Sequence, residues 1–492
     1  MSGEKQGVYF ADKKYILQMR SLHLDYKVFK LLRDAYRGGN THANRWYSGQ
    51  TVDNVLSYDR SSSYPDVMVN CKFPMKPFRE MITPTIDSVM KNIKNGYAIL
   101  MKVCVWNIRL KDQFAGIPYI SKSKIVTPAE SNGWLAEHPD AQYQIDNGRV
   151  LIITEAPVLM ALTEIDLKII SKQYDIEHIE VIEAYCSKKD YLPPEFRELI
   201  INYYKDKTGK KGVDEEIYFK AKQKINALYG MLCQNPANIP WLYDEESKEF
   251  IKDKNIIDPE SGQINDEALS EVYYKFIRSS VMAYQLGVWV CALARLRLQE
   301  MIDICGDQIV YVDTDSVKFR NKGKISFDAY NKKRIADDMK SGAFADDPKG
   351  YTHYMGVAEC ETPEPIQFKT LGAKKYLYRD SKGVFHLTVA GVSKKMGLFD
   401  LMTPAFEGKP YGFAAFENDF VFEKGGGLDV KYNDNVNFWY DYKGHHIHIT
   451  DNCYLYNSTY KLGQTDEYKH LIEHLADVEL DISLDRHFDA LL

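Results

Sequence analysis

The segment from Ile309 to Phe319 places two acidic residues between two apolar β-forming runs, and reads Ile-Val-Tyr-Val-Asp-Thr-Asp-Ser-Val-Lys-Phe. This pattern predicts a strand, a tight turn and a second strand, with Asp313 and Asp315 at or beside the tip. Two carboxylates held this close repel each other unless a cation offsets the repulsion. Asp and Ser are also common in exposed turns, so a turn without a ligand is an open alternative.

A third acid follows another apolar run. Residues 52–58 read as a strand that ends at Asp59, before a Ser-rich turn. If the two strands are neighbours in one sheet, Asp59 lies beside Asp313 and Asp315. A few carboxylates with room for substrate phosphates suit Mg²⁺, and two such ions activate an attacking hydroxyl and stabilise a leaving oxygen. The alternative is a strand followed by an ordinary Ser-rich turn.

The most basic stretch of the chain, residues 205–224, holds seven Lys. We expect a helix to begin after Gly212, with Asp214 as its N-cap, and to end near Gly230. Acidic residues in its first turn complement the helix dipole.

One face of this helix carries Lys222, Asn226 and Tyr229, at positions i, i+4 and i+7. The ammonium of Lys222 is suited to hold a triphosphate, and the amide of Asn226 is suited to fix its orientation. The phenol of Tyr229 is suited to stack on a base pair. Tyr229 and Gly230 would let that base pair approach closely. The alternative is a solvated Lys-rich face.

Composition favours a globular protein of several units. The chain has 492 residues, of which 45% are hydrophobic and 27% charged, with a net charge of −6. This length corresponds to about three or four domains. The eight Cys form no CxxC pair, which argues against a zinc site or a disulfide scaffold. The polar N-terminus and the lack of an apolar run of ~20 residues predict a soluble intracellular protein without a membrane segment.

Other segments carry weaker structural signals. We expect β-strand runs at Tyr97–Trp106 and Gln144–Ile153, and a helix at Thr163–Gln173. Residues 236–270 have the composition of a hairpin insertion, residues 277–303 predict one long apolar helix, and the last part of the chain predicts a terminal helix. The run at 445–448 (His-His-Ile-His) fits a half-exposed strand better than a metal site, because no acidic partner stands at ligand spacing.

Together these segments resemble motifs A, B and C of the family B DNA polymerases, in the right order. They read Asp59-x-x-Ser62-x-Tyr64-Pro65, Lys222-x-x-x-Asn226-x-x-Tyr229-Gly230 and Tyr311-x-Asp313-Thr-Asp315-Ser316. The finer resemblance is to the protein-primed branch of phages and linear plasmids. It rests on Tyr36-Arg37-Gly38-Gly39 upstream and Lys374-Lys375-Tyr376 downstream, and covers about residues 20–430. Ser63 and Ala227 depart from the residues usual in the family.

The resemblance implies an α+β right-hand fold with palm, fingers, thumb and two insertions. The expected units follow the order of the motifs. They are 1–50 (N-terminal segment), 51–75 (palm, motif A), 76–190 (first insertion and palm), 191–235 (fingers, motif B), 236–272 (second, hairpin-like insertion), 273–395 (palm, motif C) and 396–492 (thumb and tail).

The resemblance also implies roles for single residues. Asp59 and Asp315 would be the principal ligands of two Mg²⁺ ions, for which Mn²⁺ is expected to substitute. Asp313 would be auxiliary, and the Arg60 carbonyl would reach the nucleotide-side ion. The expected dNTP contacts are Ser62, Tyr64, Lys222, Asn226, Tyr229, Lys210 and Lys211. The expected DNA contacts are Tyr36, Arg37, Gly38, Gly39, Gly230, Lys374, Tyr376 and Lys394.

The expected function is template-directed DNA synthesis by a two-metal mechanism, onto a primer or a terminal-protein hydroxyl, in replication of phage, plasmid or other mobile DNA in a bacterial cytoplasm. The partners would be primer-template DNA, dNTPs and a terminal protein. Only 58 residues precede Asp59, so we expect no 3′–5′ exonuclease in this chain. Whether that activity is lost, lies on a separate chain or has been cut away is an open alternative. Alternatives are a non-catalytic template-binding subunit, a two-metal nuclease, or a polymerase that extends DNA or RNA primers.

Overall fold

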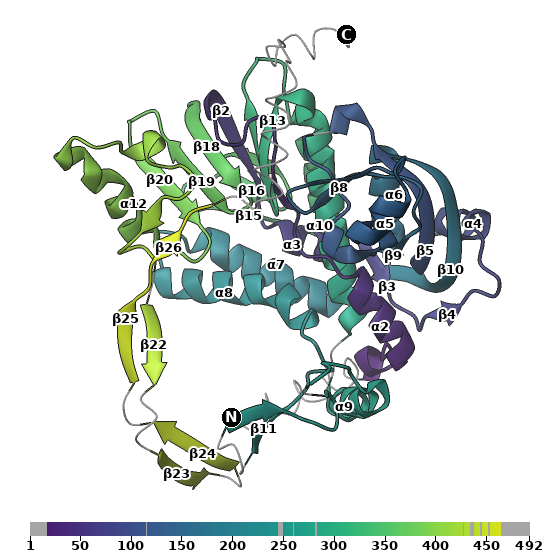
Figure 1. Ribbon diagram of the computed structural model, residues 1–492. Coiled ribbons are helices and arrows are strands. Elements are labelled where there is room, and N and C mark those ends of the chain that lie inside the picture. Colours follow the sequence, from purple (N-terminus) through teal and green to yellow (C-terminus); the bar gives the residue numbers. More distant parts are fainter. Residues whose placement is uncertain are drawn as a thin grey trace, which may run out of the picture.

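The structure is a computed structural model that describes residues 17–114, 116–244, 249–258, 260–280, 283–426, 428–432, 437–442, 445–450 and 453–463. Two large antiparallel sheets lie on either side of a central helix (Figure 1). Within the described ranges, no helix combines the length and the apolar character needed to cross a membrane.

The first sheet, the palm sheet, has the strand order β1-β13-β14-β2-β18-β19-β20, with β17 also paired to β2. The acidic hairpin predicted from the sequence forms its centre, and its apolar side chains, such as Val310 and Val317, are fully buried. The strands are β1 (Thr41–Ala43), β2 (Thr51–Arg60), β13 (Ile309–Asp313), β14 (Ser316–Arg320), β17 (Ala358–Cys360), β18 (Ile366–Gly372), β19 (Lys375–Arg379) and β20 (Phe385–Val389).

The second sheet is built on two long paired strands, β5 (Tyr97–Leu110) and β10 (Tyr174–Tyr191). Helix α6 (Glu164–Gln173) packs on it and begins at the N-cap Thr163, as predicted. The other elements are β3 (Lys72–Pro74), β4 (Arg79–Glu80), α4 (Ile86–Lys94), β6 (Ile125–Val126), α5 (Asn132–Glu137), β7 (Tyr143–Asp146), β8 (Arg149–Ile153) and β9 (Val158–Thr163).

The predicted run Gln144–Ile153 is not one strand but the hairpin β7–β8. Asn147 and Gly148 form its turn, with φ of 45° and 76°. Asn-Gly is the pair that most readily adopts two successive left-handed conformations, so this turn could have been read from the sequence.

Helix α10 (Tyr284–Cys305) lies between the two sheets and is buried on nearly all sides. The helix ends two residues after the predicted residue 303, where Gly306 follows with φ of 53° and stops it. The predicted start at residue 277 is wrong. A separate helix, α9 (Asp266–Ser279), ends where Ser280 turns to an extended conformation. The remaining helices of this part are α2 (Tyr26–Ala35), α3 (Ser63–Asn70) and α11 (Asp328–Ser341).

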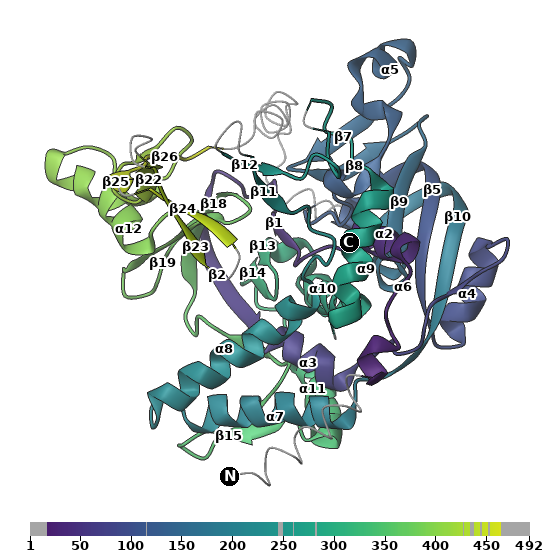
Figure 2. The same ribbon diagram turned by 90° about the horizontal axis from the view of Figure 1, so that it is seen from below.

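Helices α7 (Pro194–Gly209) and α8 (Glu215–Leu232) form an antiparallel pair that packs against α3. Asp214 caps α8 as predicted, since its side chain accepts a hydrogen bond from the Ile217 amide. The predicted hairpin insertion contains β11 (Trp241–Asp244) and β12 (Glu249–Lys252). Figure 2 shows the α7–α8 pair, the second sheet and the C-terminal elements on three sides of the palm sheet.

The C-terminal part begins with α12 (Lys394–Met402), which packs on β20. Residues 445–450 form a strand, as predicted, while the predicted terminal helix lies outside the described residues. The other two-stranded sheets are short antiparallel pairs, and all but β15–β16 belong to the C-terminal part. They are β15 (Phe344–Asp346) with β16 (Thr352–Tyr354), β21 (Val421–Phe422) with β26 (Tyr460–Lys461), β22 (Leu428–Tyr432) with β25 (Cys453–Asn457), and β23 (Asn437–Tyr442) with β24 (His445–Thr450).

Candidate active site on the palm sheet

Three acidic residues meet where β2 ends beside the β13–β14 turn. Asp59 is the register partner of Ser316, and the Arg60 amide donates to the Asp315 carbonyl at 3.0 Å. The predicted proximity of Asp59 to Asp313 and Asp315 is therefore confirmed. It follows from strand pairing between segments about 250 residues apart in the chain.

Asp59 and Asp315 hold their protons more tightly than exposed carboxyl groups do. Burial, followed by the charges of Asp315 and Glu361, raises the pKa of Asp59 to about 8. Burial raises the pKa of Asp315 to about 6, although the Arg60 cation opposes this shift. Partly buried carboxylates that repel one another are the groups that a divalent cation stabilises best.

The acidic set fits Mg²⁺ in its chemistry, since hard carboxylate oxygens are the ligands this ion prefers. Among the described residues, no three His, Cys, Asp or Glu side chains already converge as a complete metal-binding group. An ion here would therefore need further oxygen ligands beyond the protein carboxylates, as Mg²⁺ sites that bind substrate phosphates commonly do.

Asp313 differs from the other two acids because it already has partners. Its carboxylate accepts from Thr41 Oγ1 at 3.0 Å and forms an ion pair with Lys374. The Lys374 amide in turn donates to the hydroxyl of Tyr311 at 2.9 Å, and Tyr376 packs edge-on against the same ring. Lys374 and Tyr376 thus adjoin the acids, and their contact with a primer terminus stays a prediction.

Lys318 is a buried cation that the sequence reasoning missed. Its Nζ donates to Ser57 Oγ at 2.8 Å and lies 3.9 Å from Glu361. It also lies over the Tyr376 ring, 5.5 Å from the centroid. Burial lowers the pKa of Lys318, while the nearby acids, Asp59 among them, oppose this. A Lys inside an apolar strand, three positions after Asp315, was the available signal.

The side chain of Arg60 has a structural role. It is buried, and its guanidinium pairs with Asp66 at 2.6 Å and donates to Ser63 Oγ at 2.7 Å. The polar residue at 63, unusual for the family that the sequence resembles, thus accepts a hydrogen bond from a buried cation. The contact predicted for the Arg60 carbonyl with an ion stays a prediction.

Two tyrosines from different motifs stack beside the acids. The rings of Tyr64, in α3, and Tyr229, in α8, lie 3.8 Å apart between centroids, with an angle of 20° between their planes. The structure therefore brings the second half of motif A and motif B together. Asn226 is exposed on the same helix, and a side chain added at Gly230 would meet only open space.

Lys207 is the second residue that sequence reasoning missed. Its Nζ donates to Ser62 Oγ at 2.8 Å, at the point where Ser62 adopts a left-handed conformation with φ of 49°. Burial, followed by the charge of Lys222, lowers the pKa of Lys207. Lys207 therefore lies close to Lys222, the residue that the sequence predicts to bind the triphosphate.

The predicted partners Lys210 and Lys211 are exposed in the turn after α7. Lys211 still contributes positive charge at Lys207. Sequence spacing could not show that Lys207, and not Lys210 or Lys211, turns toward the site. This is decided by the packing of α7 on α3.

The Tyr36-Arg37-Gly38-Gly39 loop packs against the acidic turn. A Cβ at Gly39 would lie 2.8 Å from the Thr314 side chain, so glycine permits this close approach of the loop to the turn. Arg37, however, points inward and donates to the Ala35 and Ala161 carbonyls at 3.0 and 2.9 Å. Its guanidinium therefore satisfies buried backbone groups, and the expected contact of Arg37 with DNA stays a prediction.

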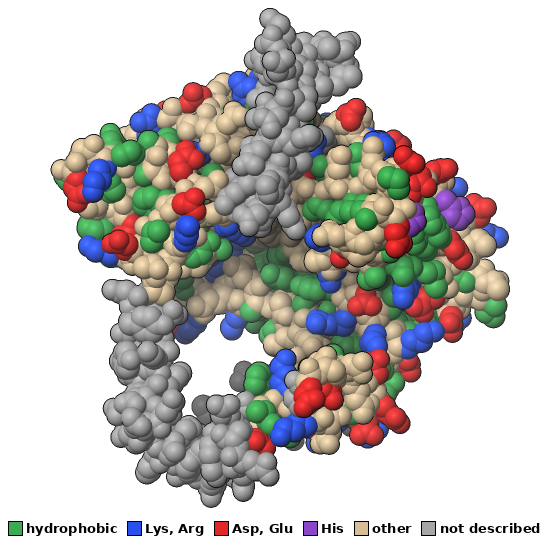
Figure 3. All heavy atoms as spheres, in the orientation of Figure 1, with side chains coloured by type: hydrophobic (Ala, Val, Ile, Leu, Met, Phe, Trp, Pro, Cys, Tyr) green, Lys and Arg blue, Asp and Glu red, His purple; other side chains and the backbone are tan. Residues whose placement is uncertain are grey.

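The remaining predicted DNA contacts occupy different environments. Tyr36 is half-buried, and burial raises the pKa of its hydroxyl. Gly38 is exposed, and Lys394 is exposed at the first turn of α12, apart from the carboxylates in the fold. Acidic and basic side chains are interspersed over the face seen in Figure 3. Binding of DNA to this face would therefore depend on local groups of Lys and Arg side chains.

Comparison with known proteins gives a consistent result. The sequence profile of the organellar and viral type B DNA polymerases matches residues 6–275, more than half of the chain. The DNA polymerase of Bacillus phage Nf is 24% identical over 292 residues, which cover 58% of this chain and 42% of that protein. The DNA polymerase of Bacillus phage phi29 is 22% identical over 311 residues, which cover 62% of this chain and 44% of that protein. The chain thus spans less than half the length of these relatives.

The fold resembles solved structures of phi29 DNA polymerase. With the complex containing primer-template DNA, the TM-score is 0.57 at 17% identity, covering 89% of this chain and 63% of that chain. With the complex that also contains incoming nucleotides, the TM-score is 0.55 at 18% identity. These similarities confirm the predicted right-hand type of polymerase fold. Together with the profile match, they show that the chain belongs to the organellar and viral type B family of DNA polymerases.

Proposed function

We propose that this chain catalyses template-directed DNA synthesis. The observation that carries the proposal is the meeting of Asp59 with the Asp313-Thr314-Asp315 turn, near two inward-turned lysines, Lys207 and Lys318. In the reaction, a primer 3′-hydroxyl attacks the α-phosphorus of a dNTP and a new O–P bond forms. The bond to the pyrophosphate oxygen breaks, and the hydroxyl proton passes to solvent.

Each side of the site would serve one part of this reaction. Asp59 and Asp315 would hold two Mg²⁺ ions, which supply charge neutralisation for the attacking and leaving oxygens. Lys207, Ser62 and Lys222 would bind the triphosphate, and the stacked Tyr64 and Tyr229 would support the sugar and base. These groups act by positioning the reactants and by offsetting charge that develops in the transition state.

The proposed partners are primer-template DNA and dNTPs. The solved phi29 polymerase complexes contain these same ligands, and their fold is shared here. A terminal-protein hydroxyl as the first primer is a finer proposal, supported by the resemblance to the protein-primed branch. A primer-extension assay with and without such a protein separates the two priming modes.

The test of the proposal is primer extension with Mg²⁺ and the four dNTPs. Replacing Asp315 by Asn should lower the rate by at least ~10³, about 4 kcal/mol of barrier, because one metal-binding carboxylate is lost. Primer-template binding should survive. Asp140→Asn, an exposed acid in a loop of the second sheet, is the matched control and should leave the rate unchanged.

Extension by Asp315→Asn at the wild-type rate would exclude the carboxylate assignment. Binding of primer-template without any extension by the wild-type protein would favour the template-binding subunit instead. Raised carboxylate pKa values argue against that subunit, since acids that repel each other stabilise nothing unless they bind a cation.

A further inference from the structure

A buried lysine lies on the same face of the palm sheet as the carboxylates. Lys318, in β14, is the register partner of Tyr311 on one side and of Ser57 on the other. Ser316, two residues earlier in the same strand, is the register partner of Asp59. Because residues two apart in a strand point to the same face, Lys318 lies on the face that carries Asp59. Lys318 is only 5% exposed, and a lysine is rarely buried to this extent unless its ammonium is paired.

Among the described residues, the Lys318 ammonium has few polar partners. Its Nζ donates to Ser57 Oγ at 2.8 Å, and this hydroxyl in turn donates to the Glu361 carboxylate at 2.6 Å. The Glu361 carboxylate itself lies 3.9 Å from Nζ, beyond hydrogen-bond distance, and its side chain is half exposed. One hydroxyl and one partly solvated carboxylate offset only part of the cost of burying an ammonium.

The aromatic ring of Tyr376 is the third partner of this ammonium. Nζ of Lys318 lies over the ring, 5.5 Å from its centroid, and a cation is attracted to a ring face most strongly where water is excluded. The same ring packs edge-on against Tyr311, 5.2 Å away at 62°, and against Phe368, 5.3 Å away. The Tyr376 ring is therefore held by side chains from three other strands, β14, β13 and β18.

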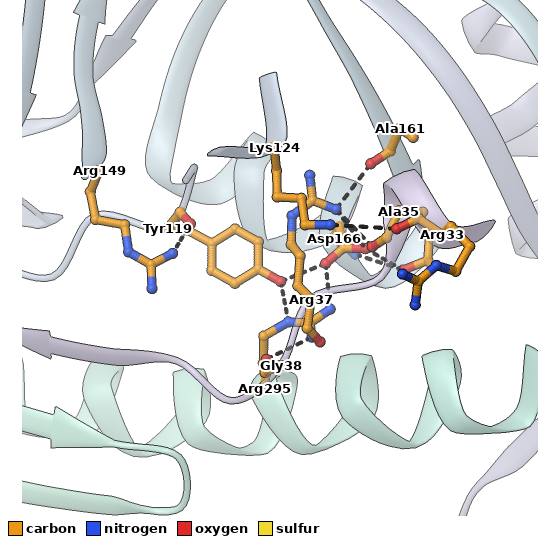
Figure 4. Close-up of polar contacts among 11 residues, drawn as sticks. Arg33, Ala35, Arg37, Gly38, Tyr119, Lys124, Arg149, Ala161, Asp166 and Arg295 are labelled. Atoms are coloured by element: carbon orange, nitrogen blue, oxygen red, sulfur yellow. Dashed lines mark hydrogen bonds and ion pairs between the residues drawn. The ribbon is translucent and has the colours of Figure 1, made fainter. Parts of the chain in front are cut away.

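Arg295 shows how this protein stabilises another buried cation. Figure 4 shows its guanidinium in an ion pair with the fully buried Asp166, at 2.8 Å. Arg295 also donates to the Tyr119 hydroxyl at 2.8 Å and to the Gly38 carbonyl at 3.0 Å. Within the described part of the chain, Lys318 has no carboxylate closer than Glu361. Stabilisation of the fold therefore does not explain the burial of Lys318 as it explains that of Arg295.

Tyr376 is connected to the acidic turn through its neighbours. Tyr311, against which its ring packs, accepts a hydrogen bond from the Lys374 amide at 2.9 Å. The Lys374 ammonium forms an ion pair with Asp313. A shift of the Tyr376 ring would therefore disturb the part of the site that lies beside Asp313, where the sequence predicts the primer terminus.

We propose that Lys318 is a positioning residue, whose ammonium holds the Tyr376 ring in place for the nucleotide at the primer terminus. This inference rests on the proposed function and on the predicted contact of Tyr376 with the primer. Because Lys318 is buried, it acts through the ring and does not touch the DNA. Ser57 fixes the ammonium from the opposite side, so the direction of the lysine side chain is set by strands β2 and β14.

The experiment measures primer extension at varied concentrations of primer-template and of dNTPs. Lys318→Met keeps a long side chain but removes the ammonium. It should raise the KM for primer-template about tenfold, as expected for the loss of one desolvated cation–ring contact, with kcat and the KM for dNTPs changed less than about twofold. Lys318→Arg should restore most of the affinity, because a guanidinium also packs on ring faces. Lys324→Met, at an exposed lysine after β14, is the matched control and should behave as the wild type.

A double-mutant cycle tests whether Lys318 acts through Tyr376. Tyr376→Ala alone should raise the KM for primer-template by about tenfold or more. Lys318→Met added to Tyr376→Ala should change this KM by less than about twofold, because the ring that the ammonium holds is then absent. If Lys318→Met fails to fold, Ser57→Ala serves in its place, since it removes the hydroxyl that fixes the ammonium. Ser57→Ala should also raise the KM, and only when Tyr376 is present.

Effects of Lys318→Met and Tyr376→Ala that multiply in the double variant would overturn the proposal. A lower Tm of Lys318→Met with an unchanged KM for primer-template would also overturn it, since Lys318 would then only stabilise the sheet. Failure of the proposed function is distinguishable from both results. In that case the wild-type protein extends no primer, whereas failure of this inference leaves wild-type extension and its loss in Asp315→Asn intact.

Discussion

Asp59 and Asp315 set the chemistry of the site through their unusual proton affinity. Each lies in a partly buried position where an ionised carboxylate loses hydration and faces other acids. In the protein without metal ions, the protonated form of Asp59 is therefore favoured near neutral pH, and Asp315 keeps its proton to a higher pH than an exposed carboxyl does. Divalent cations and protons should compete for these oxygens. This competition can be measured as a change in the Tm with pH and with Mg²⁺.

The first prediction concerns stability against pH. A carboxylate whose folded-state pKa is raised stabilises the fold at low pH, and this contribution is lost as pH rises through the folded-state pKa. For Asp59 the loss should extend from about pH 4 to about pH 8. In EDTA, Asp59→Asn should therefore raise the Tm relative to the wild type at pH 8.5, and much less at pH 4.5.

Mg²⁺ supplies the matching control, since it should raise the Tm of the wild type most at high pH and raise that of Asp59→Asn far less. A Tm difference between the two proteins that does not change with pH would contradict the prediction. Asp140→Asn should follow the wild type under all these conditions.

The second prediction concerns the choice of sugar. The ring of Tyr64 is held by its stack on Tyr229, so it cannot easily turn away from a neighbouring ligand. If this ring lies beneath the nucleotide sugar, a 2′-hydroxyl collides with it, and deoxynucleotides are favoured by steric exclusion. Tyr64→Val should therefore raise the ratio of ribonucleotide to deoxynucleotide incorporation in primer extension. An unchanged ratio would remove Tyr64 from this role.

At the scale of elements, the pairing of α7 with α8 decides which lysines reach the site. Both helices carry Lys, but α7 packs on α3 and turns Lys207 toward Ser62, while Lys205 stays exposed. On α8, by contrast, Lys220, Lys222 and Lys224 are all exposed.

The third prediction follows from this packing. Lys207→Gln should raise the KM for dNTPs by about 10- to 100-fold, the effect of losing one charge-assisted hydrogen bond, with primer-template affinity unchanged. Lys205→Gln, two residues away on the same helix, should leave both quantities unchanged. Steady-state extension kinetics with varied dNTP concentration check this. Equal effects of the two variants would show that general charge, not a specific contact, is responsible.

For the whole molecule, the net charge of −6 means that DNA affinity must come from local cations. Lys374 illustrates how such a cation is controlled, because its ammonium is paired with Asp313. A divalent cation at the carboxylates would compete for Asp313 and release Lys374 toward a phosphate.

The fourth prediction is that the contribution of Lys374 to DNA binding depends on divalent ions. With Ca²⁺, which supports binding without rapid synthesis, Lys374→Gln should flatten the slope of log K against log salt for duplex by about 0.9. In EDTA, its slope should be close to that of the wild type. Anisotropy titrations over a salt series make the comparison. A slope difference of the same size in both conditions would show that Asp313 does not control Lys374.

Much of the site was predictable because its signals are local. The Asp313-Thr314-Asp315 turn, the Asp214 cap of α8 and the helix at 164–173 follow from turn propensity, capping and periodicity over a few residues. The misread run at 144–153 was also local, since the Asn-Gly turn was visible. The break between α9 and α10 was not, because apolar spacing continues across Ser280 although the backbone there is extended.

The sequence by itself determined the acidic hairpin, the basic helix and the order of the motifs, because each depends on the chemistry of adjacent residues. Only the tertiary structure decided that Lys207 faces inward, that Arg37 is buried against Ala161, and that Lys318 is buried between Ser57 and Glu361. The direction of a long cationic side chain is set by which elements pack against it. Its burial is stable only where distant segments supply acceptors, and spacing along the chain does not contain that information.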